Sequence, residues 1–188
     1  TSPEASKSFI DCNIDALLQP ILSKSQNISL KSQAISLMKN ILLDNDEIII
    51  QYYIDNNYIE LFISEYKSLS SNPELGINNE VDSLLLSVAS LLTSFTLFPE
   101  LVPEKLYYSI FETITDIFRK RNQYSILGVV VYDVLKCLLS IFRRIDLSIL
   151  IKTGFINQIY EILNEENGFD FYLKMIINYK CSFQFLQN

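Results

Sequence analysis

Few of the 188 residues could carry acid–base or nucleophilic chemistry. The chain has no histidine, so it lacks the commonest general base near neutral pH and the commonest metal ligand. Its cysteines, Cys12, Cys137 and Cys181, lie far apart and form no C-x-x-C pair, so neither a zinc site nor a thioredoxin-like motif is indicated. We therefore expect no enzymatic activity, no cofactor and no metal. Scattered cysteines fit reduced thiols in a cytoplasmic protein, with the nucleus as the alternative location.

Two clusters of carboxylates remain as candidates for a cation or acid–base site. Neither cluster has the alternating ligand spacing of a calcium loop, and the four glycines are isolated, so no phosphate-binding loop is indicated. Both clusters fall at the ends of predicted helices, where acids act as caps or as solubilising charge. We adopt that interpretation for Asp44, Asp46 and Glu47, and for Glu161, Glu165 and Glu166.

A stripe of small polar residues is a more regular pattern. Ser83, Ser87, Ser90 and Ser94 are spaced by four, three and four residues, so they share one face of a helix. Stripes of this kind could line a shallow polar groove for an extended or helical partner segment. The alternative is that they are solvated helix faces or small residues that allow close packing. The candidate partner-binding residues are Ser36, Lys39, Asn40, Ser83, Ser87, Ser90, Ser94, Asp133, Lys136, Ser140 and Arg143.

Helices must position these residues, because apolar residues recur at steps of three and four along most of the chain. Pro20 is expected to end the first helix early or to kink it. The pair Asn56-Asn57 and Gly154 are expected to end short helices, since both residue types tolerate left-handed backbone. The predicted helices are 8–23, 29–43, 47–54, 58–69, 79–98, 126–144, 147–152, 155–164 and 169–185. One more helix is predicted to start at Pro103 and to end before a polar connector at 119–125.

The predicted organisation is one domain over residues 9–188 behind a polar tail, 1–8, with an exposed loop at 70–78. The tail does not have the character of a signal peptide. The two most apolar runs are Leu84–Phe98 and Ile126–Phe142. The first is too short to span a membrane and the second contains Asp133 and Lys136, so we expect no membrane span.

The net charge of −7 and a pI of about 4.6 bear on the partner. An acidic chain has no electrostatic reason to bind a phosphate backbone, so we expect no nucleic acid. The densest basic runs, 119–121 and 143–144, lie near predicted helix C-termini, where cations interact favourably with the helix dipole.

A succession of short, second and long third helices recurs roughly every 45 to 50 residues, a period typical of helical repeats. One copy begins at Glu47 and the last at Leu147. This succession resembles armadillo repeats. The segment 152–163 is similar to the junction of the first two helices of that family, and 33–42 is similar to its third helix. HEAT repeats are the near alternative, and the short first helix is expected to be absent or fused around 101–121.

The resemblance implies an all-α, right-handed superhelix of about three repeats with partial ends, whose third helices line the concave side. It also implies a scaffold or adaptor of eukaryotic type that binds another protein there. The ladder of Trp and Asn with which some armadillo proteins hold peptides is absent, because the chain has no Trp. The alternative function is a structural subunit of a large cytoskeletal or RNA-containing assembly. The apolar stretch 179–186 fits self-association or a longer solenoid of which this chain is a fragment.

Overall fold

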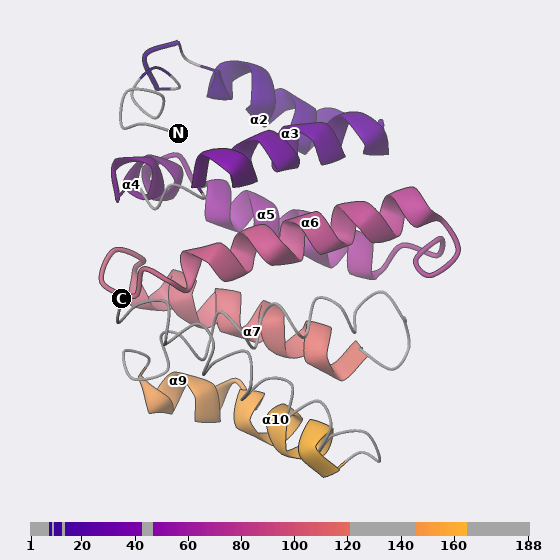
Figure 1. Cartoon of the computed structure of the whole chain (residues 1–188), viewed down its shortest axis with the longest axis vertical. Helices are drawn as coiled ribbons and strands as arrows, with labels where there is room; N and C mark the ends of the chain where they lie inside the picture. The colour runs from indigo at the N-terminus through magenta and orange to yellow at the C-terminus, as the bar shows by residue number, and fades with distance from the viewer. Residues whose placement is uncertain (1–7, 9, 13, 43–46, 121–145, 165–188) are drawn as a thin grey trace, which may run out of the picture.

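The computed structural model describes residues 8, 10–12, 14–42, 47–120 and 146–164 (Figure 1). These residues form eight helices and contain no strand, which confirms the all-α class for the described part of the chain. The helices are α2 (Asp15–Lys24), α3 (Ile28–Leu42), α4 (Glu47–Asp55), α5 (Tyr58–Ser70), α6 (Asn79–Phe95), α7 (Glu104–Lys120), α9 (Leu147–Lys152) and α10 (Phe155–Asn164).

The helices pack in a repeated order. Helix α2 contacts α5, α5 contacts α7, and α7 contacts α10, so these four helices form one row. Helix α3 contacts α2 and α6, and α6 contacts α5 and α7, so α3 and α6 lie together beside that row. Figure 1 shows the helices following one another down the long axis of the molecule, from α2 at one end to α10 at the other.

The depth of burial of each helix follows from its neighbours. Helix α5 buries residues at steps of one, three, one, three and three along one side, and full burial of each such side chain contributes roughly 1.5–3 kcal/mol. Helix α6 is in contact with α3, α5 and α7, and it buries residues on most of its circumference. The buried residues of α5 are Tyr58, Ile59, Phe62, Ile63, Tyr66 and Leu69.

Aromatic rings fill two parts of the core. In the first part, the ring of Tyr53 lies 5.3 Å from that of Tyr58 and 6.2 Å from that of Phe95, measured between ring centroids. In the second part, the ring of Phe155 lies 4.9 Å from that of Phe118 and 6.0 Å from that of Phe111. Edge-to-face pairs at these distances add about 0.5–1.5 kcal/mol to the stabilisation from area burial.

Both aromatic clusters are built at the same kind of helix junction. Helix α4 ends before Asn57, which has a φ of 58°, and α5 starts with Tyr58; helix α9 ends before Gly154, which has a φ of 73°, and α10 starts with Phe155. Tyr58 and Phe155 are each 1% exposed. The two junctions are 97 positions apart in the chain, and the predicted left-handed residues are confirmed at both.

Hydrogen bonds at the two junctions also match one another. The side-chain amide of Asn56 donates to the carbonyl of Tyr52 at 2.9 Å, and the hydroxyl of Thr153 donates to the carbonyl of Ile149 at 2.8 Å. Each of these residues lies 97 positions from its counterpart. A side chain that returns to the carbonyl four residues earlier stabilises the last turn of the short helix, so the two junctions share one local design.

The first predicted helix, 8–23, is wrong as one continuous helix. The chain makes turns at Cys12 and Ile14, and α2 begins at Asp15. The prediction that Pro20 ends the helix early is also wrong, because α2 continues to Lys24. Pro20 is the sixth residue of α2, so it removes one hydrogen bond, that to the carbonyl of Ala16, without ending the helix.

Other boundaries differ less from the prediction. Helix α6 ends at Phe95 rather than at 98, where the hydroxyl of Thr96 donates to the carbonyl of Thr93 at 2.6 Å. Residues 96–103 form turns with no helix among them. The bounds of α9 and α10 agree with the prediction. The predicted helices 126–144 and 169–185 lie outside the described residues.

The segment 71–78 between α5 and α6 consists of turns and is mostly exposed, as predicted for this loop. It is nevertheless anchored, since Leu75 is only 5% exposed and the amide of Gly76 donates to the carboxylate of Asp82 at 2.8 Å. Gly76 has a φ of 80°, a conformation that glycine adopts without strain. Of the predicted polar tail, only Ser8 is described.

Candidate functional site

The polar stripe predicted on the third helices begins on α3. Ser36 and Asn40 lie one turn apart and are exposed, whereas Lys39 is half-buried. Two apolar residues share the exposed side of this helix, since Leu30 and Leu37 are 40% and 43% exposed. The accessible surface of α3 is therefore mixed polar and apolar rather than purely polar.

On α6 the serine stripe is present but recessed. Ser83 is exposed, while Ser87, Ser90 and Ser94 are half-buried. The hydroxyl of Ser87 donates to the carbonyl of Ser83 at 2.9 Å, and that of Ser94 donates to the carbonyl of Ser90 at 3.1 Å. These two hydroxyls already use their proton within the helix, so they could offer a partner only an acceptor oxygen.

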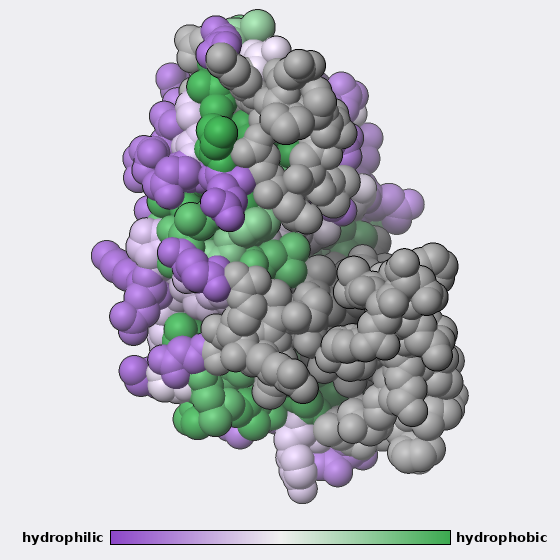
Figure 2. Space-filling model, turned by 60° about the vertical axis from the view of Figure 1, so that its left-hand side comes forward, coloured by the Kyte–Doolittle hydropathy of each residue, from purple (hydrophilic) through white to green (hydrophobic). Residues whose placement is uncertain are grey.

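Because α3 contacts α6, the structure brings these two parts of the stripe onto neighbouring helices. The remaining predicted stripe residues, Asp133, Lys136, Ser140 and Arg143, lie outside the described residues. Figure 2 shows one side of the molecule, where hydrophilic residues project along the length of the stack and hydrophobic residues lie between them in separate patches.

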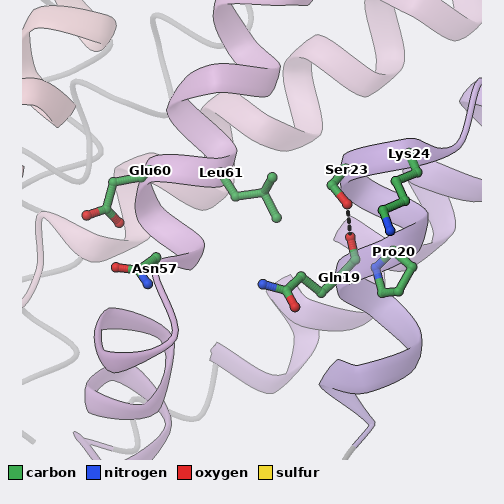
Figure 3. Close-up of a pocket in the computed structure, with 7 residues that line it drawn as sticks. All are labelled: Gln19, Pro20, Ser23, Lys24, Asn57, Glu60 and Leu61. Carbon is green, nitrogen blue, oxygen red and sulfur yellow. Dashed lines mark hydrogen bonds between the residues drawn. The ribbon is translucent and has the colours of Figure 1, made fainter.

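The sequence patterns did not reveal two hollows on the row formed by α2, α5 and α7. The first hollow, of about 510 Å³, lies between α2 and α5 (Figure 3). In Figure 3, Leu61 projects from α5 toward α2, and the carboxylate of Glu60 points away from α2. The residues that line this hollow are Gln19, Pro20, Ser23 and Lys24 of α2, and Asn57, Glu60 and Leu61 at the start of α5.

The second hollow, of about 500 Å³, lies between α5 and α7. Glu60 lines this hollow as well as the first one, so the two hollows adjoin across α5. The residues that line it are Glu60, Ile63, Ser64 and Lys67 of α5, and Pro103, Lys105, Leu106 and Ser109 at the start of α7. We call the surface that contains both hollows the lysine face, after Lys24, Lys67 and Lys105.

Within the described part of the chain, the lysines of the lysine face lack the carboxylate partners that two other lysines have. The ammonium of Lys31 lies 2.7 Å from a carboxylate oxygen of Glu65, and that of Lys120 lies 2.9 Å from one of Asp116. The three lysines of the lysine face form no such pair with any described residue, and all three are exposed.

A buried phenol links α5 to α7 beside this surface. The hydroxyl of Tyr66 donates to the carboxylate of Asp116 at 3.0 Å, and Lys120 pairs with the same oxygen. Burial raises the pKa of Tyr66 above its usual value, and the negative charge and hydrogen bond of Asp116 raise it further. The phenol therefore stays protonated and acts as a structural donor.

The carboxylate clusters considered above are only partly described. Glu47 and Glu161 are exposed, and their predicted companions lie outside the described residues. Within the ranges that the structure covers, no group of three or more Cys, Asp or Glu is arranged to hold a metal ion. No helix in those ranges combines the length and apolar character needed to cross a bilayer.

Comparisons with known proteins add no relative to this description. No protein-family model, no curated protein and no solved structure matches the chain.

Proposed function

We propose that this protein is a non-catalytic scaffold of armadillo or HEAT type, a right-handed superhelix of about three repeats that binds another protein. The observation that carries the proposal is the pair of matched junctions, Asn57-Tyr58 and Gly154-Phe155. Both junctions have a left-handed residue, a buried aromatic after it, and a side-chain hydrogen bond to the carbonyl four residues earlier, and recurrence of this kind supports a repeat fold.

The order of helix contacts supports the same proposal. In a solenoid each unit packs against its neighbours, and the contacts α2–α5, α5–α7 and α7–α10 are consistent with such a stack. Such a row exposes several helices side by side, and a stable protein interface needs about 800 Å² on each partner. The polar stripe on α3 and α6 is the candidate groove for a partner segment.

A pull-down from an extract of the source cells tests the scaffold and the groove separately. We expect the chain to enrich a protein that a column of an equally acidic, unrelated protein does not retain. Ser36→Arg, which places a bulky charge on the exposed side of α3, should reduce that enrichment. Ser71→Arg, at an exposed turn outside α3, is the matched control. Lack of any enrichment by the unsubstituted chain would contradict the scaffold. Equal enrichment by the unsubstituted chain, Ser36→Arg and Ser71→Arg would contradict only the groove.

The second candidate function is a structural subunit of a larger assembly, and apolar side chains on α9 and α10 favour it. Leu147 is 53% exposed, Ile151 is 61% exposed and Tyr160 is 68% exposed, a density typical of surfaces that other chains cover. Size-exclusion chromatography separates the two candidates. A monodisperse isolated chain supports the adaptor, whereas concentration-dependent self-association or aggregation supports the subunit.

A further inference from the structure

The lysine face has a shape that suits an extended peptide rather than a compact ligand. Its two hollows adjoin at Glu60 and involve three successive helices, α2, α5 and α7. A peptide that crosses from one hollow to the other would therefore contact three helices of one row.

Each hollow combines an apolar part with unused polar groups. Leu61 and Pro20 supply apolar surface in the first hollow, and Leu106 supplies it in the second. The side-chain amides of Gln19 and Asn57 make no hydrogen bond with another described residue. An extended segment could thus bury one or two apolar side chains while its backbone finds donors and acceptors in the walls.

The charge of the lysine face is opposite to that of the chain as a whole. The lining of the two hollows includes three lysines and one carboxylate, that of Glu60, although the chain carries a net charge of −7. Glu104 and Glu112 are exposed on α7, but they line neither hollow. A surface of this sign complements a negatively charged partner.

We propose that the lysine face binds an acidic linear segment of another protein, with one or two apolar residues of that segment seated in the two hollows. This inference rests on the proposed scaffold function and assigns that function a second surface, distinct from the polar stripe of α3 and α6. Carboxylates of the segment approach Lys24, Lys67 and Lys105, and the affinity is sensitive to salt because the pairs are exposed.

The test uses a phage library of 12-residue peptides panned against the full chain. We expect the enriched peptides to be rich in Asp and Glu with one or two apolar residues. The affinity of a fluorescein-labelled enriched peptide, measured by polarisation, should fall on the order of 10- to 100-fold in the triple variant Lys24→Gln, Lys67→Gln, Lys105→Gln. Glu60→Gln should strengthen binding by roughly 2- to 5-fold, because it removes the opposing carboxylate.

Matched controls make the outcome decisive. Arg119→Gln with Lys152→Gln removes two exposed cations away from the lysine face and should leave the peptide affinity unchanged, and circular dichroism checks that each variant is folded. Enrichment of non-acidic peptides, no enrichment, or an affinity that the triple variant does not change would overturn the inference. So would binding of a labelled oligouridine that the triple variant abolishes. Peptides lost on Ser36→Arg alone would overturn this inference while leaving the scaffold function supported.

Discussion

The junction between α4 and α5 and the junction between α9 and α10 have the same backbone but different surroundings. Ile50 and Ile59 flank the first junction and are fully buried, whereas their counterparts 97 positions later, Leu147 and Ile156, are 53% and 38% exposed. Helix α5 contacts α2, α4, α6 and α7, while α10 contacts α7 and α9 among the described helices. The difference teaches that the local sequence sets the turn, and the neighbouring helices set the burial.

The largest expected effect tests whether the buried aromatic anchors both junctions. We expect Tyr58→Ala and Phe155→Ala each to lower the free energy of unfolding by about 3–5 kcal/mol, because both rings are buried among other rings. Urea denaturation measures this loss, with the exposed Tyr160→Ala as a control that should change it by less than about 0.5 kcal/mol. A loss below about 1 kcal/mol for Phe155→Ala alone would break the equivalence of the junctions.

The next largest expected effect on the free energy of unfolding comes from substituting the residue with left-handed backbone at each junction. Gly154→Ala should cost about 1–2 kcal/mol, since a side chain at positive φ is strained. Space is not the cause, because a Cβ at this position would lie 3.5 Å from the guanidinium of Arg119, an ordinary contact. Gly154→Asn should cost less, and Asn57→Gly should change stability by only a few tenths of a kcal/mol. Equal costs for Ala and Asn at 154, measured by thermal unfolding, would contradict this account.

Tyr66 marks a difference between the regions of the two junctions, because the position 97 residues later holds Leu163, which has no hydroxyl. Tyr66→Phe should lower stability by about 1–2 kcal/mol at neutral pH through loss of the hydrogen bond to Asp116.

The pH dependence of that contribution follows from the raised pKa of Tyr66, caused first by burial and then by Asp116. The folded chain holds the phenolic proton more tightly than the unfolded chain, so the contribution is complete below about pH 10 and is lost as the pH rises further. Urea titrations between pH 8 and 11 should show a steeper fall for the wild type than for Tyr66→Phe. Parallel curves would exclude the phenol as the source.

The smallest expected effect concerns the start of α9. Its counterpart α4 begins further upstream relative to the junction. Asp146 caps α9, and the amide and hydroxyl of Ser148 each donate to its carboxylate at 2.8 Å. These hydrogen bonds lower the pKa of Asp146, the backbone bond most. The stabilisation is therefore present above about pH 4 and lost as the pH falls below it. Asp146→Asn keeps an acceptor and should flatten the acid limb of the stability curve slightly.

Local signals account for what the sequence predicted correctly. Asn57 and Gly154 end their helices through backbone preference alone, so neither depends on distant contacts. The turns at Cys12 and Ile14, which interrupt the first predicted helix, were not predicted because no local signal marks them. Apolar residues continue at helical spacing through Ile10 and Ile14, and periodicity does not detect a break that preserves the spacing.

The candidate sites show the same division. Helical spacing predicted that Ser83, Ser87, Ser90 and Ser94 share one side of a helix, but it could not give the depth at which neighbouring helices cover them. The lysine face could not be predicted from the sequence, because its hollows form where three helices meet. Lys24, Lys67 and Lys105 lie about 40 residues apart, and only the stacking of α2, α5 and α7 brings them to one surface.

An experimental structure of the chain tests the proposed repeat most directly, by superposing the backbone of residues 49–62 on that of residues 146–159. The account predicts that the two segments coincide through the turn, with Asn57 and Gly154 both at positive φ, and that α5 and α10 lie on opposite sides of α7. Junctions of different backbone conformation, or α5 and α10 packed against the same side of α7, would contradict a chain built by repetition of one unit.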